Sequence, residues 1–167
     1  IIFIVYQNVK QNKSLPMLQE KEKDFEKLHN QSRAKFLDNL CGKLEQNNLG
    51  IDLYSSANDE CGFSKNYYLI LFPGGDVEIM CSLESRLDDR MLEELSSVEK
   101  PKKIRNQIAL AIQTRLINIV SKKSMIALSS HFILPENILA GSEAACKTCD
   151  MIWRYAGDKS TDFNYYT

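Results

Sequence analysis

The strongest pattern of apolar and polar positions lies between Tyr67 and Leu83. Tyr67–Phe72 is an unbroken apolar and aromatic run, rich in residue types that favour strands. Pro73-Gly74-Gly75-Asp76 has the composition of a tight turn, and apolar residues then recur at every second position: Val77, Ile79, Cys81 and Leu83. Period two is typical of a half-buried strand. The stretch therefore predicts a β-hairpin, and because a strand is expected after the glycines, it does not predict a phosphate-binding loop.

Two further segments are predicted as strands. Ile51–Tyr54 is a short apolar segment that follows a glycine. Met125–Leu134 alternates its larger apolar residues with smaller or polar ones until Pro135 stops the pattern. Between the first of these strands and the hairpin, Ser55–Asn66 is polar and predicts a loop.

In the longer segments the apolar residues recur at helical spacing. Gln19–Asn47 is predicted as a long helix whose charged beginning, Gln19–Asp24, overhangs into solvent. Asp88 and Asp89 are expected to cap a short helix. Lys102–Val120 carries the broadest apolar stripe in the chain, and we expect this helix to lie across the sheet.

The last predicted helix begins at Ser142, which can cap it, runs through Tyr155 and is ended by Gly157. Together the elements predict an α+β fold with an antiparallel sheet of three to five strands. The long amphipathic helix is expected to cover one face of that sheet, and the N- and C-terminal helices are expected to cover the rest.

The chain divides into three parts. Residues 1–18 form an apolar N-terminal segment and linker, 19–157 a single α+β domain, and 158–167 a polar and aromatic tail that we expect to order only on contact. Ile1–Tyr6 is too short to span a bilayer. It is interpreted either as a short strand or as the trailing end of a membrane anchor whose start lies upstream of Ile1.

The composition of the chain bears on its class of function and on its compartment. The chain has 21 basic and 22 acidic residues among 167, so it lacks the basic surplus expected of a nucleic-acid-binding domain. Its five cysteines are an odd number at scattered positions, which favours a reducing compartment over a secreted disulfide framework. We therefore expect the domain in the cytoplasm, or membrane-anchored with the domain in a reducing compartment.

Cys146 and Cys149 form the one pair with the spacing of a chemical motif. Cysteines three apart on a helix can share a metal or form a redox pair. A zinc site needs two more ligands, for which Cys61 and His131 are the available types. A redox pair would stand at the start of a helix, whereas Cys146 is expected inside one. The pair is therefore a candidate metal or redox site, and a structural role is the alternative.

Aromatic residues gather at the C-terminal end and are candidates for interaction with a partner. The set is Trp153, Arg154, Tyr155, Phe163, Tyr165 and Tyr166. Aromatic residues beside an arginine are typical of interface anchors. No nucleophilic triad is indicated around His131, and no complete catalytic motif is found, so we expect a protein that is not an enzyme and carries no cofactor.

The order of the predicted elements resembles that of type III secretion chaperone-like α+β domains, and it is similar to small archaeal and bacterial domains of that class. The resemblance rests on the hairpin Tyr68–Leu83, the helix Ile104–Val120 and the strand Ile126–Leu134. It implies a dimer-forming domain that binds a partner without catalysis. The predicted function is thus a protein–protein interaction module, either a homodimeric chaperone-like adaptor or the soluble domain of a larger, membrane-tethered assembly. The alternative is a thiol-redox or metal-binding protein that uses Cys146 and Cys149.

Overall fold

The fold is built from helices. The computed structural model describes residues 16–44, 51–118 and 121–157, and no strand occurs in these ranges. In chain order the elements are α2 (Pro16–Lys43), α3 (Ile51–Glu60), α4 (Tyr68–Leu71), α5 (Gly75–Ser96), α6 (Ile104–Gln113), the π-helix η1 (Thr114–Asn118), α7 (Lys122–Phe132) and α8 (Ile138–Tyr155). The predicted α+β fold with an antiparallel sheet is therefore wrong for the described part of the chain.

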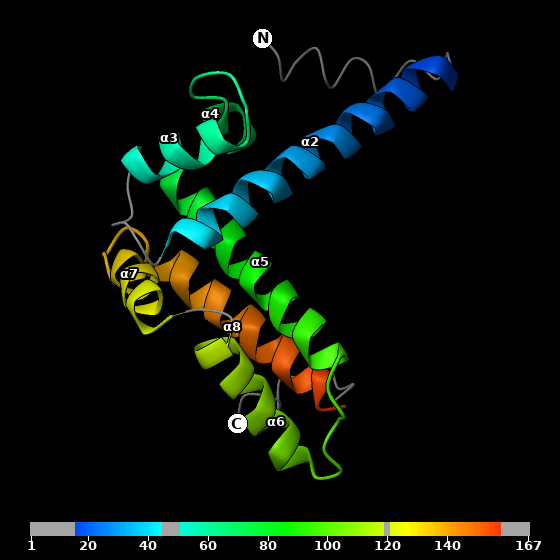
Figure 1. Cartoon of the computed structure of the whole chain (residues 1–167), viewed down its shortest axis with the longest axis vertical. Helices are drawn as coiled ribbons and strands as arrows, with labels where there is room; N and C mark the ends of the chain where they lie inside the picture. The colour runs from blue at the N-terminus through cyan, green and yellow to red at the C-terminus, as the bar shows by residue number, and fades with distance from the viewer. Residues whose placement is uncertain (1–15, 45–50, 119–120, 158–167) are drawn as a thin grey trace.

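Helix α5 lies at the centre of the bundle (Figure 1). α8 runs along it, α2 crosses its N-terminal half, and η1 also packs against it. The N-terminal part of α2 projects beyond the bundle, and the side chains from Glu20 to Leu28 are exposed. The predicted solvent overhang at the start of this helix is thus confirmed.

The apolar run at the first half of the predicted hairpin forms a single helical turn, α4. Tyr68, Leu71 and Phe72 are buried, whereas Leu69 and Ile70 are exposed. A strand would have placed Tyr68, Ile70 and Phe72 on one face. The observed spacing of three and four residues is that of a helix face.

The second half of the predicted hairpin lies inside α5. Its buried residues include Ile79, Leu83 and Leu87, each four positions after the last, and the same face continues through Met91 and Leu95. Positions separated by four fit both a period of two and a period of 3.6. The pattern extends over 22 residues, a length that ordinary strands do not reach, and this length identifies it as a helix.

The turn before α5 is held by a hydrogen bond to a side chain of α5. Gly75 has φ of +68°, a conformation that glycine adopts without strain. The backbone N–H of Gly74 donates to Glu78 Oε2 at 2.7 Å. A helix follows the two glycines, where a strand was predicted. The backbone N–H of Gly74 at its start is already bound to a carboxylate of the chain.

The other two predicted strands are helical as well. Ile51–Tyr54 is the first turn of α3, and the predicted loop after it continues that helix to Glu60. Most of Met125–Leu134 belongs to α7, in which Leu128 is fully buried while Ile126 is 59% exposed. Ser121 caps α7 by accepting a hydrogen bond from the backbone N–H of Ser124 at 3.2 Å.

The predicted helices are largely confirmed, with different boundaries. The stripe predicted over Lys102–Val120 is divided between α6 and η1. α8 ends at Tyr155 as predicted, and Gly157 follows with φ of +97°, but α8 begins at Ile138 and contains Ser142. Asp88 and Asp89 lie in the middle of α5 and cap nothing.

The core forms two clusters along α5. The larger joins α2, α3, α4 and the first half of α5 with Leu128 of α7. The smaller joins Met91 and Leu95 of α5 to Ala111 of α6 and Ile152 of α8. Asp88 lies on the buried face of α5 between the two clusters, and it marks the polar centre of the fold.

Several predictions fall outside the described residues. These are the apolar segment Ile1–Tyr6, the helix end at Asn47 and the tail Asp158–Thr167. The division of the chain into 1–18, 19–157 and 158–167 stays a prediction. Of the helices that the structure describes, none combines the length and apolar character needed to cross a membrane.

Candidate functional site

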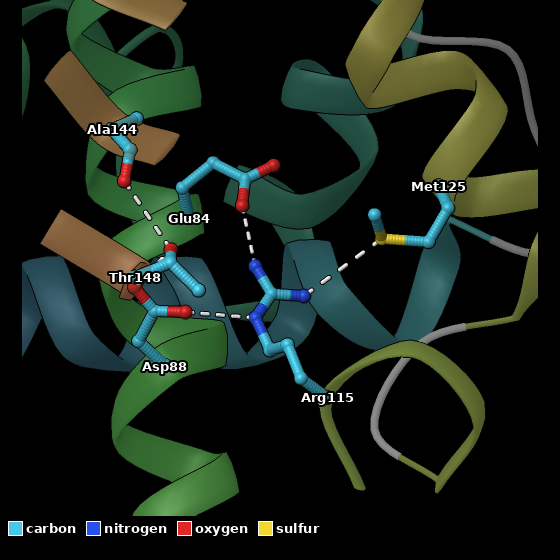
Figure 2. Close-up of polar contacts among 6 residues, drawn as sticks. All are labelled: Glu84, Asp88, Arg115, Met125, Ala144 and Thr148. Atoms are coloured by element: carbon cyan, nitrogen blue, oxygen red, sulfur yellow. Dashed lines mark hydrogen bonds and ion pairs between the residues drawn. The ribbon is translucent and has the colours of Figure 1, made fainter. Parts of the chain in front are cut away.

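A buried arginine lies at the centre of the candidate site (Figure 2). Arg115 belongs to η1 and its side chain is 4% exposed. Its Nε donates to Asp88 Oδ1 at 2.8 Å, and its Nη2 donates to Glu84 Oε2. The hydroxyl of Thr148 on α8 lies 2.7 Å from Asp88 Oδ2 and 3.2 Å from the carbonyl oxygen of Ala144. One polar network thus joins α5, η1 and α8.

The local structure explains how these side chains meet. Glu84 and Asp88 are four residues apart on α5, so they project from the same face of the helix. Arg115 stands in a π-helical turn directly after α6. Short π-helical segments occur frequently at functional sites. Here the π-turn carries the arginine that reaches between α5 and α8.

The network contains more negative than positive groups. Among the described residues, Arg115 is the single cation paired with the two carboxylates of Glu84 and Asp88. Burial raises the pKa of the Glu84 carboxyl and the neighbouring Asp88 charge raises it further, while Arg115 partly opposes both effects. Buried charges are costly unless they are paired and hydrogen-bonded, and this network meets that requirement for both carboxylates.

Part of the Arg115 guanidinium lacks a strong acceptor. Among the residues that the structure describes, its Nη1 donates only to the sulfur of Met125, at 3.8 Å. A thioether sulfur is a weak acceptor. The N–H groups of Nη1 therefore remain available to an oxygen atom that comes close to Met125.

That side of Arg115 faces a pocket of about 480 Å³ between η1, α7 and α8, with Glu84 of α5 in its wall. We call it the α7–α8 pocket. Its lining is mainly apolar or small, and it consists of Glu84, Arg115, Leu116, Met125, Ser129, Phe132, Ile133, Ile138, Gly141, Ser142, Ala144, Ala145, Thr148 and Cys149. Ile133 and Ile138 are 73% and 53% exposed, so the pocket opens to the surface along apolar side chains.

A second, polar cavity of about 320 Å³ lies on the other side of Glu84, between α5 and α8. It shares Glu84 and Ala144 with the α7–α8 pocket. Its remaining walls include Cys81, Glu143 and Lys147. Glu84 thus lines both the mainly apolar α7–α8 pocket and this more polar cavity.

The two cysteines of the predicted motif lie on α8 and are both exposed free thiols. Cys149 lines the α7–α8 pocket, and Cys146 does not. Cys61 is buried in the larger core cluster, and His131 lies beside Asn137, whose Nδ2 is 3.3 Å from the His131 Nε2. Among the residues with described positions, no group of three or more His, Cys, Asp or Glu side chains could hold a metal. The structure therefore gives no support to the metal or redox alternative.

The predicted interaction residues are only partly described. Trp153 is 39% exposed near the end of α8. Arg154 forms an ion pair with Asp150 one turn earlier, at 2.6 Å, and Lys100 lies 4.7 Å from the centroid of the Tyr155 ring. Phe163, Tyr165 and Tyr166 fall outside the described residues. A role for this set in binding a partner stays a prediction.

A site formed by Arg115, Glu84, Asp88 and Thr148 was not predicted from the sequence. One signal could have found them. Arg115 is the one basic residue in the sequence from Asn106 to Val120, and a basic residue in so apolar a stretch must either reach the surface or find a buried carboxylate. Glu84 and Asp88 have the spacing to supply two carboxylates on one helix face, but Glu84 follows the predicted strand and was assigned to no element, and Asp88 was assigned to a helix cap.

Comparison with known proteins identifies a similarity to one family. The model of the COQ9 family matches residues 138–167, of which 138–155 form α8. Curated relatives named "Ubiquinone biosynthesis protein COQ9, mitochondrial" are 33% identical in Rattus norvegicus, 35% in Bos taurus and 33% in Homo sapiens, each over 81 residues or 48% of this chain. The chain spans about a quarter of the length of these relatives (26%, 25% and 25%). No solved structure matches it.

These findings correct the predicted family and function. The similarity is to COQ9 proteins, and the described fold is helical, so the resemblance to type III secretion chaperone-like α+β domains is wrong. The chaperone-like adaptor and interaction module that followed from it are likewise overturned, and the thiol-redox or metal-binding alternative is not supported. What this chain resembles is part of a mitochondrial protein of ubiquinone biosynthesis.

Proposed function

We propose that this chain acts in ubiquinone biosynthesis in mitochondria, and that its α7–α8 pocket holds an apolar molecule of that pathway. The observation that carries the proposal is the pocket itself, which has apolar walls and ends at the polar group of Arg115 and Glu84. The names of the curated relatives supply the pathway and the compartment. The proposed location is thus mitochondrial, which differs from the expected cytoplasm, while the expected alternative of a membrane-anchored domain stays a prediction.

The chemistry of the pathway matches the pocket. Ubiquinone is a substituted benzoquinone with an isoprenoid tail, so its ring carries oxygen acceptors while its tail is a hydrocarbon. The pocket volume of about 480 Å³ lies within the range of small-molecule sites, which are mostly apolar with a few placed polar groups. The volume suits the ring end of such a molecule, with a long tail leaving past the exposed Ile133 and Ile138.

Alkylation of the two exposed cysteines of α8 offers a direct test. Decylubiquinone has a fully substituted ring and a saturated tail, so it can occupy the pocket without adding to a thiol. Bound ligand should slow alkylation of Cys149, which lines the pocket, and leave Cys146, which does not line it, unchanged. Mass spectrometry of the two sites after a brief exposure to iodoacetamide measures both rates in one sample. Equal rates with and without saturating decylubiquinone would overturn the proposal.

A pocket-filling substitution provides the second arm. Ala145 lines the pocket and is exposed, so Ala145→Phe should block ligand entry while leaving the core intact. Ala109→Phe is the matched control, because Ala109 is exposed on α6 and lies outside the pocket lining. The expected result is loss of Cys149 protection in Ala145→Phe and full protection in Ala109→Phe. Thermal unfolding of both variants with and without decylubiquinone checks binding independently, since a ligand that binds only the folded chain raises its stability.

A further inference from the structure

The unused donors of Arg115 indicate which end of a ligand the α7–α8 pocket recognises. A guanidinium carries five N–H groups, and in this buried side chain Nε and Nη2 are taken by Asp88 and Glu84. In the described part of the chain, the Met125 sulfur at 3.8 Å is the one acceptor that Nη1 has. A buried donor without a good acceptor is unfavourable, so an oxygen atom offered by a ligand at this position would be bound in preference to the sulfur.

Met125 is suited to give way to such an oxygen. It projects from α7, lines the pocket and is partly buried. Methionine has three rotatable side-chain bonds and adapts to neighbours of different shape. A ligand oxygen can therefore take the place of the sulfur beside Nη1 while the backbone of α7 stays where it is.

The charges around Arg115 determine which oxygen is accepted. Of the described residues that line the pocket, only Glu84 and Arg115 are charged, and Asp88 lies directly behind them. The single guanidinium charge is already matched by two carboxylates. A carboxylate or phosphate head on the ligand would add a further negative charge in a poorly solvated space, which is strongly unfavourable. A neutral carbonyl or hydroxyl oxygen carries no such penalty.

We propose that Arg115 is the specificity-determining residue of the α7–α8 pocket, donating from Nη1 to a neutral carbonyl or hydroxyl oxygen, and that Glu84 and Asp88 exclude ligands with an anionic head. The inference rests on the proposed function, because it concerns the same pocket. It goes further by naming the residue and the charge of the ligand head that is accepted.

Three probes with the same tail and ring test the inference on the unmodified chain. They are para-hexylacetophenone with a neutral carbonyl, para-hexylbenzoate with an anionic head, and hexylbenzene with no acceptor. Their dissociation constants near neutral pH are measured directly, from the concentration at which each probe protects Cys149 from iodoacetamide. Since a hydrogen bond from a charged donor contributes a factor of about ten or more in binding, the ketone is expected to bind about tenfold or more tightly than hexylbenzene. The benzoate is expected to bind more weakly than the ketone by at least the same factor.

Two variants separate the contributions of donor and charge. Arg115→Met combined with Glu84→Gln removes the donor without leaving two unpaired carboxylates, and it should abolish the preference for the ketone over hexylbenzene. Glu84→Gln combined with Asp88→Asn makes the site more positive and should shift the preference toward the benzoate by about tenfold. Arg105→Met, an exposed substitution on α6, is the matched control and should leave all three affinities unchanged.

The outcomes distinguish this inference from the proposed function. If hexylbenzene and the ketone protect Cys149 with equal affinity, the pocket binds apolar ligands but Arg115 does not select them. If the benzoate binds the unmodified chain as tightly as the ketone does, the exclusion of anions is wrong. If neither decylubiquinone nor any probe protects Cys149, both the proposed function and this inference are overturned. The comparison on the unmodified chain decides the question even where a variant fails to fold.

Discussion

Gly141 of α8 lies so close to Phe132 of α7 that a Cβ atom on the glycine would stand 2.6 Å from the Phe132 Cβ. The Phe132 Cβ is fixed to the backbone, so a side-chain rotation cannot relieve that contact. Both residues also line the α7–α8 pocket. The absence of a side chain at position 141 therefore sets how closely α7 packs on α8, and with it the shape of the pocket.

Gly141→Ala should consequently lower the free energy of unfolding. Alanine gains about 1 kcal/mol over glycine in a helix interior, while overpacking typically costs about 1–3 kcal/mol. A net loss of about 1 kcal/mol is expected from chemical denaturation, together with weaker protection of Cys149 by decylubiquinone.

Gly42→Ala is the matched control for this substitution. Gly42 is also helical, in α2, and nothing lies within 4 Å of a Cβ built there. The propensity gain should therefore appear alone, as a rise of about 0.5–1 kcal/mol in the free energy of unfolding. A gain of similar size in both variants would show that α7 can move away from α8 at no cost.

Arg33 on α2 is expected to be the main polar connection between α2 and the start of α5. Its Nη1 donates to the Leu71 carbonyl oxygen at 2.5 Å and to Glu78 Oε1 at 2.7 Å, and its Nη2 donates to Ser82 Oγ at 3.1 Å. Its guanidinium carbon lies 4.2 Å from the centroid of the Phe72 ring. A lysine keeps the charge but cannot reproduce the planar fork or the stacking.

Arg33→Lys should thus lower the free energy of unfolding by about 1–2 kcal/mol. Arg105→Lys, at an exposed position of α6, controls for the change of side chain and should stay within about 0.5 kcal/mol of the unmodified chain. Urea denaturation followed by far-ultraviolet circular dichroism measures both. Equal stabilities of the two variants would indicate that the Arg33 contacts contribute nothing beyond those of a surface arginine.

The long helices could be predicted from the sequence because their apolar stripes extend over many turns. α2 and the α6–η1 region show the 3.6-residue period over lengths that no ordinary strand reaches. The short segments were ambiguous because their apolar patterns extend over too few residues to reveal the period. Ile79 and Leu83 are four apart, a separation that is a multiple of two and also close to one helical turn, so a window of seven residues could not distinguish the strand from the helix.

The candidate site was harder to predict, because it depends on contacts between distant parts of the chain. Arg115 is 27 residues from Asp88 and 31 from Glu84, and nothing in either local sequence indicates the pairing. The capping and periodicity signals that indicate α-helices also do not distinguish the π-helical turn that carries Arg115. What could be inferred locally was only that a charged residue within so apolar a stretch requires a buried partner.

The pH dependence of stability should reveal the buried Glu84 carboxyl. Its pKa is raised above the ordinary glutamate value, chiefly by burial. Below the ordinary value the carboxyl is protonated in both the folded and unfolded chains. Between the ordinary and the raised pKa only the folded chain keeps the proton, so the contribution of Glu84 to stability falls as the pH rises through this window.

Glu84→Gln removes this titration. The free energy of unfolding of the unmodified chain, measured relative to that of Glu84→Gln, should therefore decline between the ordinary glutamate pKa and the raised one and then level off. Denaturation curves at closely spaced pH values measure the difference. Glu99→Gln is the control for removing a carboxyl at an exposed position. A difference that rises with pH would mean that Arg115 outweighs burial and holds the Glu84 pKa below its ordinary value.

The five cysteines should separate into two classes of reactivity. Cys146 and Cys149 are exposed on α8, whereas Cys61 is buried and Cys41 and Cys81 are half-buried. Burial raises the pKa of the Cys41, Cys61 and Cys81 thiols, so at mildly alkaline pH these three combine poor access with a low fraction of the reactive thiolate. Iodoacetamide at that pH should modify Cys146 and Cys149 first.

The remaining three thiols should react only as the chain unfolds. Mass spectrometry after increasing times of alkylation in native buffer, and again in concentrated urea, distinguishes the two classes site by site. In urea all five rates should converge, because burial no longer differs among them. Rapid native modification of Cys61 would contradict the packing of α2 on α3, since the Cys61 sulfur accepts a hydrogen bond from Asn39 Nδ2 at 3.3 Å within that contact.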